Sequence, residues 1–324
     1  MLHIGIDAGG TSTRATVVTG DGECVGYAEG SGGNPISSGK KRASDAVVSA
    51  TEAALDRAGA TLADVGEIVA AMAGNSAAES TEWLTGPLLS RGFGGTLSWE
   101  SDLLATYFSG AFSSFGYAVV SGTGAAVIRV ENGSIASTTD GLGWLLGDLG
   151  SGFWIGHQVA LAVMAEFDGR GPATALTPRL LDMMSVRTDG PNTQGRPAVL
   201  PRLITELYRL RPVQLAQFAP LAFAEPLDDV ARGILHEAGA LLAHSVATAH
   251  TSPGPLVIGG SVLAQSGHLA ESFSSHLARQ GITPDIVRVA DGAVGSAVLA
   301  LRKLSVEITG DVFRTVTASV AARR

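Results

Sequence analysis

Residues 3–18, HIGIDAGGTSTRATVV, contain two runs typical of β-strands, separated by a turn of small residues. Ile4 and Ile6 alternate with other residue types in the first run, and residues 16–18 form the second. The turn supplies a carboxylate, two adjacent glycines and a hydroxyl, from Asp7, Gly9, Gly10 and Thr11. Backbone amides in such a turn can approach a phosphate, because glycine leaves no side chain in the way. An ordinary hairpin turn would use the same residues, so the rest of the sequence is needed to tell a phosphate-binding turn from a hairpin turn.

The length and composition of the chain limit its fold and its partners. Its 324 residues exceed the usual size of one domain, so we expect two domains with a cleft between them. Charged residues make up 16% and hydrophobic residues 45%, which is typical of a compact globular protein. The formal net charge of −8 argues against a nucleic-acid partner, because the phosphate backbone attracts clustered Lys and Arg.

The cysteine content and the hydropathy of the chain limit the kinds of metal or disulfide site it can form and the compartment in which we expect it. The single Cys24 cannot form an internal disulfide, a cysteine-ligated zinc site or an iron–sulfur cluster held by the cysteines of one chain. The sequence has no run of about 18 apolar residues, and a predicted strand begins at residue 2 without a charged leader. We therefore expect a cytoplasmic protein with no membrane partner.

The first third of the chain predicts a small sheet and one long helix. Apolar or alternating runs predict strands, which we place at residues 2–7, 14–18, 23–29, 67–72 and 96–99. Apolar residues at helical spacing predict a helix over residues 43–58, with Ser44 as its N-cap. A second helix is predicted to begin just after Asp102.

The opening pattern returns near residue 117. YAVVSGTGAAVIRV, residues 117–130, again gives a strand, a turn of small residues and a strand, which predicts an internal duplication. Residues 180–250 have mostly helical spacing. A strand at 256–259 ends in a second pair of glycines, and a strand at 286–290 precedes a further helix.

Several familiar motifs are missing from the sequence. The only Gly-Lys pair, Gly39 and Lys40, does not complete a Walker phosphate loop. GLGWLLG and GSGFWIG place the last glycine one residue too late for a dinucleotide motif, and the zinc motif HExxH does not occur. What remains is three turns of small residues after apolar strands, at 9–11, 121–124 and 259–261. Together they suggest a nucleotide site made of backbone amides and hydroxyls.

Six blocks follow one another along the chain: GIDAGGTSTRATVV, GGNP, ESD, VVSGTGAAVI, GDLGSGFWIGHQ and LVIGGSV. In this order they resemble the N-acetylglucosamine kinase branch of the sugar kinase, Hsp70 and actin superfamily, also called BadF/BadG/BcrA/BcrD-type ATPases. The resemblance implies an α/β fold of two ribonuclease-H-like, actin-like ATPase lobes around a central cleft. It places the first lobe at residues 1–112, with 291–324 packing back on it, and the second at 113–290. It also implies ATP at the bottom of the cleft and the sugar above it. We further predict a homodimer.

By this resemblance, the nucleotide would lie on the three turns. Asp7 would lie near the magnesium of Mg-ATP, through a water molecule, since magnesium keeps much of its water shell. Thr11 and Thr123 would bond phosphate oxygens. The chain would pass close to the nucleotide at Gly9, Gly10, Gly122, Gly259 and Gly260. The same residue types also suit turns that bind nothing.

The resemblance also assigns the acceptor side of the site. Asp102 would contact the sugar and take the proton of its reacting hydroxyl, and the start of a helix would keep this carboxylate ionised. The alternative is that Asp102 only caps the helix. Asn34 and Asp148 would bond sugar hydroxyls, and the 2-substituent would lie against Gly141, Leu142 and Gly143.

The chain departs from the family at two of these positions. Leu142 and Leu149 stand where the resembled family commonly carries an aromatic residue and an acid, and by the resemblance both positions would border the 2-substituent. We predict an ATP-dependent kinase of the 6-hydroxyl of N-acetylglucosamine, with glucosamine, N-acetylmuramic acid and glucose left open. The lactyl carboxylate of N-acetylmuramic acid would need a cation, and we find none near Asn34 or Asp148.

Two alternatives are not sugar kinases. Iron–sulfur activator ATPases of the same broad family need more cysteines than Cys24 alone. A non-enzymatic nucleotide-binding regulator would have no need of Asp102, Asn34 and Asp148 together.

Overall fold

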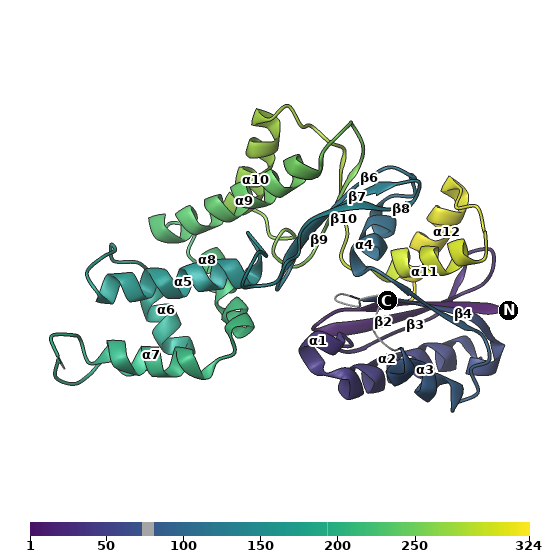
Figure 1. Ribbon diagram of the computed structural model, residues 1–324, viewed down its shortest axis with the longest axis horizontal. Helices are drawn as coiled ribbons and strands as arrows, with labels where there is room; N and C mark the ends of the chain where they lie inside the picture. The colour runs from purple at the N-terminus through teal and green to yellow at the C-terminus, as the bar shows by residue number, and fades with distance from the viewer. Residues whose placement is uncertain (73–80, 193) are drawn as a thin grey trace.

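The computed structural model describes residues 1–72, 81–192 and 194–324, and within them the strands form two five-stranded sheets (Figure 1). The first sheet has the order β3-β2-β1-β4-β5, with strands at Cys24–Ser31, Ser12–Val18, Leu2–Ala8, Val65–Met72 and Thr96–Glu100. The second has the order β10-β9-β6-β7-β8, with strands at Ile286–Arg288, Leu256–Gly259, Gly116–Ser121, Ala125–Glu131 and Ser134–Asp140.

The two sheets share one topology. In each, three sequential antiparallel strands, β1-β2-β3 or β6-β7-β8, are extended by two parallel strands beside the first of them. This is the strand order of a ribonuclease-H-like lobe, and it occurs twice. The predicted fold class and the predicted internal duplication are therefore confirmed.

The first sheet is covered on one face by α2, Lys40–Ala58, where Ile4 and Ile6 of β1 join Val47 of the helix in one buried cluster. This helix begins earlier than predicted. Gly39 is its N-cap and Ser44 is buried inside it, so the prediction of Ser44 as the N-cap was wrong. The charged residues 40–42 carry no apolar signal, and the chain enters α2 directly from α1, Pro35–Ser38. The lobe also contains α3, Glu82–Leu89, and the short 3-10 helix η1, Leu62–Asp64.

Two helices lie between the sheets (Figure 1). α4, Asp102–Gly110, follows β5 of the first sheet but packs against β6 and β9 of the second. α11, Ala293–Lys303, follows β10 of the second sheet but packs against β1 and β4 of the first. A Cβ at Gly5 would lie 2.2 Å from the backbone nitrogen of Ala297, so β1 and α11 are in backbone contact. The residues that precede α11 thus reach the carboxyl end of β1.

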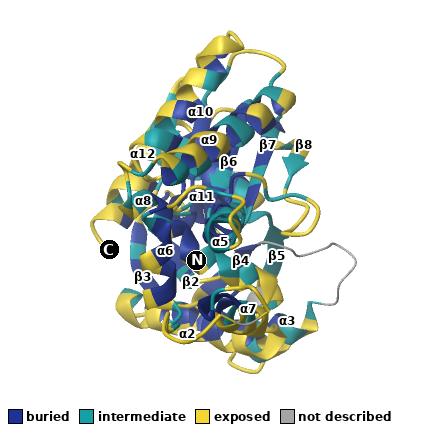
Figure 2. Cartoon of the chain, turned by 90° about the vertical axis from the view of Figure 1, so that its left-hand side faces the viewer, coloured by how far each residue is buried: buried dark blue, intermediate teal, exposed yellow. Residues whose placement is uncertain are grey.

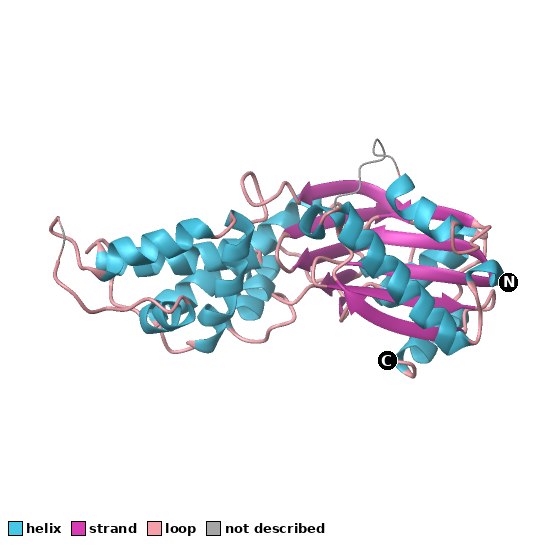
Figure 3. Ribbon diagram, turned by 90° about the horizontal axis from the view of Figure 1, so that it is seen from below, coloured by secondary structure: helices cyan, strands magenta, loops and turns pink. Residues whose placement is uncertain are grey.

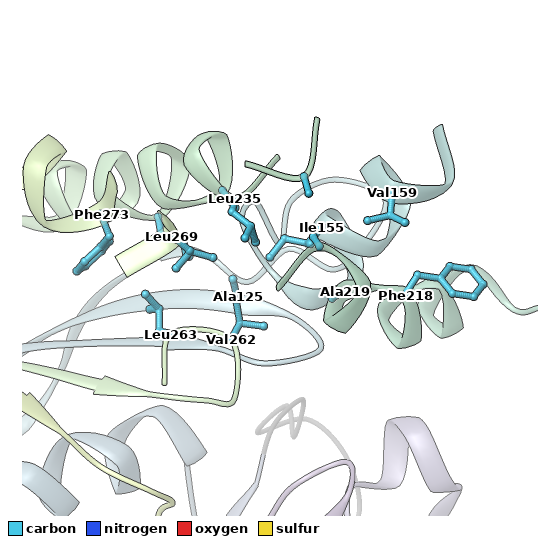
Figure 4. Packing of buried hydrophobic residues seen from close by; sticks show 14 of the residues in the cluster. Ala125, Ile155, Val159, Phe218, Ala219, Leu235, Val262, Leu263, Leu269 and Phe273 are labelled. Carbon is cyan, nitrogen blue, oxygen red and sulfur yellow. The ribbon is translucent and has the colours of Figure 1, made fainter. Parts of the chain in front are cut away.

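The helices after the second sheet build the larger core. They are α5 at Gly152–Phe167, α6 at Leu176–Met183, α7 at Val199–Arg209, η2 at Pro212–Phe218, α8 at Ala219–Ala224, α9 at Asp229–Ala249 and α10 at His268–Arg279. Figure 4 shows Ile155 of α5 and Leu235 of α9 in one cluster with Ala125 of the sheet. Figures 1 and 3 show α5 to α8 at one end of the molecule, beyond the strands. The helical prediction for residues 180–250 is confirmed.

The final helix, α12 at Gly310–Ala321, packs on α11 and β3. Buried residues concentrate on the strands and on the inward faces of the helices, while the outer helix faces are exposed (Figure 2). None of the helices in the described ranges is long and apolar enough to cross a membrane.

Candidate active site

The turn after β1 and the GGNP segment are interlocked by their backbones. The amides of Gly33 and Asn34 both donate to the carbonyl of Gly9, at 3.1 and 3.2 Å. A Cβ at Gly32 would lie 2.2 Å from the carbonyl oxygen of Gly10, which only glycine permits. The predicted phosphate turn and the predicted sugar loop are therefore neighbours, with Gly10 and Thr11 exposed beside Asn34.

Local geometry fixes Asn34 at the start of α1. Its Oδ1 accepts the amide of Ile36 at 2.8 Å, as an N-cap does, and Pro35 occupies the first helical position. The side chain is therefore held by the loop that presents it, and a hydroxyl that binds its Oδ1 would share that oxygen with the Ile36 amide.

Asp7 is a buried carboxylate at the end of β1. Its Oδ2 accepts the amide of Gly292 at 2.9 Å and pairs with Arg14 Nη1 at 3.4 Å. Burial raises the pKa of Asp7 to about 6, against the opposing effects of Gly292 and Arg14. The negative charges of Asp291 and Asp102 raise it further, so the structure brings Asp102 within electrostatic reach of Asp7.

Arg14 and Asp291 extend this cluster, and sequence reasoning missed both. Arg14 Nε lies 3.2 Å from Asp291 Oδ2, and Arg14 Nη2 lies 3.0 Å from Glu29 Oε1. Asp291 also pairs with Arg324 at 2.6 Å. Arg14 is the residue opposite Asp7 in the β1–β2 hairpin, so counting register along the predicted hairpin could have found it. Asp291 comes from the far end of the sequence and carries no comparable signal.

Asp102 is the first residue of α4, and Ser101 before it is the N-cap. The Leu103 amide lies 3.1 Å from the Ser101 hydroxyl and 3.0 Å from Asp102 Oδ1. Burial raises the pKa of Asp102, while the amides at the helix start lower it only in part. The helix start therefore acts on this carboxylate in the direction expected from the sequence, but desolvation is the larger effect on its pKa.

The turn of the second lobe abuts the start of α5. The amides of Gly152 and Phe153 donate to the carbonyls of Gly122 and Thr123, at 2.7 and 3.1 Å, and Thr123 itself is exposed. Gly260 has a φ of 90°, and a Cβ there would lie 2.3 Å from the carbonyl oxygen of Ser121. Gly259 is buried beside it. Two of the three predicted nucleotide turns are thus in contact.

Asp148 lies against the same turn. Its Oδ1 accepts the amide of Ala125 at 3.2 Å, and its carboxylate covers Gly124, where a Cβ would meet it at 3.0 Å. Burial raises the pKa of Asp148, the Ala125 amide lowers it, and the charge of Asp140 raises it further. Among the hydrogen bonds and ion pairs of the described residues, none joins Asp148 to Asp102. The structure thus groups the site residues by lobe.

The remaining predicted contacts lie in the loop between β8 and α5. Gly141 and Gly143 have φ of 72° and 82°, and both are exposed together with Leu142. Exposed apolar side chains follow one another here, with Trp144 at 41% and Leu149 at 39% exposure. This run faces solvent, which single scattered apolar residues often do but a contiguous group seldom does.

Comparison with known proteins gives the family. A model of the BadF/BadG/BcrA/BcrD ATPase family matches residues 4–300 of the chain. The chain belongs to this family. Membership in an ATPase family implies the use of ATP, and the resemblance noted in the sequence is confirmed.

Similar proteins include sugar kinases. The chain is 26% identical over 320 residues to the N-acetyl-D-glucosamine kinase of Dictyostelium discoideum, covering 93% of this chain and 98% of that one. It is 26% identical over 185 residues to the N-acetylmuramic acid/N-acetylglucosamine kinase of Clostridium acetobutylicum, covering 57% of this chain and 60% of that one.

A solved structure of a candidate N-acetylglucosamine kinase from Chromobacterium violaceum has a TM-score of 0.70 and 26% identity. The match covers 92% of this chain and 98% of that one. A ROK family glucokinase from Streptomyces griseus, at 18% identity and a TM-score of 0.55, shares the fold over 93% of this chain and 100% of that one.

Proposed function

We propose that this ATPase-family protein is a sugar kinase that transfers the γ-phosphoryl group of ATP to the 6-hydroxyl of N-acetylglucosamine. The observation that carries the proposal is the pair of hydrogen bonds from Gly33 and Asn34 to Gly9. It sets a loop suited to sugar hydroxyls directly beside a turn suited to phosphates. The similarity to N-acetylglucosamine kinases over nearly the whole chain supports the choice of sugar.

Asp102 is the base in this mechanism. Its carboxylate takes the proton of the 6-hydroxyl while that oxygen bonds the γ-phosphorus and the bond to the β-phosphate oxygen breaks. The products are ADP and the sugar 6-phosphate, and the proton passes from Asp102 to solvent. A buried carboxylate with a raised pKa suits this task, because proton transfer is most efficient when the pKa of the base lies near the working pH.

The residues present fit a magnesium ion on the phosphates. The ion prefers hard oxygen ligands and keeps much of its water, so one or two carboxylates beside the phosphates are enough to hold it. Asp7 and Asp102 contribute negative charge that a cation would offset. Asp7 would hold the ion through water, as the family resemblance implies, while Arg14 and Gly292 hold its Oδ2 in place. When bound, magnesium would neutralise charge on the phosphates.

The second lobe supplies the other contacts. The exposed Thr123, with Gly122, Gly259 and Gly260, is suited to the nucleotide, and Asp148 to two sugar hydroxyls. These groups act together with Asn34 and Asp102 when the lobes close over both substrates. Closure also excludes water, which would otherwise compete with the sugar for the phosphoryl group.

A coupled ADP-release assay with N-acetylglucosamine, glucosamine, N-acetylmuramic acid and glucose tests the proposal. We expect the highest kcat/KM with N-acetylglucosamine, and phosphorus NMR of the product should place the phosphate on oxygen 6. Phosphate on the anomeric oxygen would refute the placement of the sugar beside Asp102. No turnover with any of the four would refute the kinase assignment for these sugars.

One observation favours N-acetylmuramic acid as a second substrate. Arg42 Nε donates to the carbonyl of Ser38 at 2.9 Å, and the amide of Ser38 donates to the carbonyl of Asn34 at 3.0 Å. Arg42 therefore lies closer to the sugar loop than the sequence suggested. It lines a groove of about 420 Å³ together with Gly32, Ser38 and Ser49, and the Asp45 carboxylate lines the same groove. A lactyl carboxylate would find a cation there. Arg42→Gln should then raise the KM for N-acetylmuramic acid and leave that for N-acetylglucosamine unchanged.

The homodimer, the cytoplasmic location and the lobe boundary between residues 112 and 113 stay predictions. Light scattering of the purified protein, with and without substrates, would test the first of them.

A further inference from the structure

The loop from β8 to α5 carries predicted sugar contacts near both ends, and its middle is open to solvent. Residues 141–146 are all exposed, and the side chains of Leu142, Leu145 and Leu146 are 66%, 73% and 75% exposed. Such a segment has little packing of its own to fix its conformation. Its geometry therefore depends on how its two ends are held.

Asp140, the last residue of β8, holds both ends together. Its Oδ1 accepts the amide of Asp148 at 2.7 Å, and its Oδ2 accepts the amide of Leu149 at 2.9 Å. Hydrogen bonds to an ionised acceptor are stronger than those between neutral groups. Asp140 and Asp148 both have left-handed backbone conformations, with φ of 61° and 56°, which are uncommon outside glycine although Asp adopts them more readily than most residues.

Gly147 and Asp148 lie close to the Asp140 carboxylate. A Cβ at Gly147 would lie 2.1 Å from Asp140 Oδ1, so a side chain at 147 would displace it. The Asp148 carboxylate is in turn held by the Ala125 amide at 3.2 Å. The backbone of Asp148 is thus set by Asp140, and its side chain by the turn that carries Thr123.

We propose that Asp140 is a positioning residue for the sugar: it holds the backbone at residues 148 and 149 so that the Asp148 carboxylate is presented to the sugar hydroxyls. This inference rests on the proposed function, in which Asp148 binds the sugar. Asp140 acts through Asp148. The same Asp140 carboxylate also accepts the amide of Leu149, so two successive backbone amides are held by one side chain.

Asp140→Asn tests this role, because asparagine keeps the size of the side chain but offers one acceptor oxygen in place of two. We expect the KM for the sugar to rise about tenfold, while kcat and the KM for ATP change less than about threefold. Asp168→Asn is the matched control, since its carboxylate pairs with the exposed Arg170 in the same lobe and should leave all three unchanged.

A double-mutant cycle identifies the route. Calorimetric titration gives the sugar Kd of each variant. The double variant Asp140→Asn, Asp148→Asn should have nearly the same Kd as Asp148→Asn alone, because both substitutions remove the same contact, that of Asp148 with the sugar. Independent, additive losses would overturn the proposal, and so would equal rises in the KM values for sugar and ATP.

A melting curve shows whether Asp140→Asn folds. If it does not, Asp140→Glu replaces it with the same expectations, since its extra methylene moves the carboxylate off the two amides. If the wild type phosphorylates the sugar but the Asp140 variant has an unchanged sugar KM, only the role of Asp140 is overturned. A wild-type protein without sugar phosphorylation would overturn the proposed function and this inference with it.

Discussion

Asp7→Asn should make the protein more stable at alkaline pH, and the pKa of Asp7 gives the size of the effect. That pKa is raised from 3.8 to about 6, chiefly by burial. Each pKa unit corresponds to about 1.36 kcal/mol, so ionised Asp7 costs the folded state about 3 kcal/mol. Asparagine keeps an oxygen that can accept the Gly292 amide and removes the buried charge. The variant should therefore gain up to about 3 kcal/mol in free energy of unfolding at pH 8.

The sign of the pH dependence follows from the same values. The folded state binds the Asp7 proton more tightly than the unfolded state does, so the cost is absent below pH 3.8, grows as the pH rises, and is complete above about 6. The difference in stability between Asp7→Asn and the wild type should therefore be nearly constant above about pH 6 and shrink from there toward pH 3.8.

Urea unfolding at several pH values, without nucleotide or divalent cations, measures this difference. Asp45→Asn is the control, because Asp45 is an exposed carboxylate paired with Lys41 and its loss should change stability by less than about 0.5 kcal/mol. A variant that is no more stable than the wild type at pH 8, or a gain that does not depend on pH, would refute the reasoning. A gain in stability with a loss of activity would mark Asp7 as a charge kept for function.

Three further variants test other parts of the site. Asp102→Asn should lower kcat about a hundredfold or more with little change in ATP affinity, and it should raise the melting temperature at neutral pH, because burial raises the pKa of Asp102. Gly292→Ala places a Cβ 2.9 Å from Asp7 Cγ and should lower kcat, whereas Gly20→Ala, in open space, should not. Trp144→Phe should remove most of the sugar-dependent change in tryptophan emission and leave the melting temperature unchanged, because Trp144 is 41% exposed; a retained signal would place the reporter elsewhere.

The fold could be predicted because its signals are local. The alternation of Ile4 and Ile6 with other residue types predicted β1, and the repeat of strand, turn and strand at residue 117 predicted two equivalent sheets. The turns after these strands could be assigned for the same reason, since glycine and hydroxyl residues follow an apolar run at each of them. Their contacts with the loops at Asn34 and Asp148 depend on the packing of whole lobes and could not be predicted.

The pKa shifts in the site and the contacts between residues far apart in the sequence could not be predicted from the sequence. The start of α4 was predicted, but the burial that raises the pKa of Asp102 depends on both sheets. The place of Arg42 near the loop at Asn34 could not be predicted either, because it depends on how α1 leads into α2. Asp140 ends an ordinary strand, and its role appears only where the loop returns to it at residue 148.

The contacts of Asp7 depend on α11, which follows the second sheet in the sequence but packs on the first. Its strand belongs to the first sheet, while the amide that holds its Oδ2 belongs to Gly292, 285 positions along the chain. Gly292 lies just after β10 of the second sheet and just before α11, which packs on the first. A rotation of the second sheet toward the first would therefore act on the connection at Asp291 and Gly292. Because Arg14 ties Asp291 to Asp7, such a movement would reach the carboxylate beside the predicted phosphate turn without passing through the substrate.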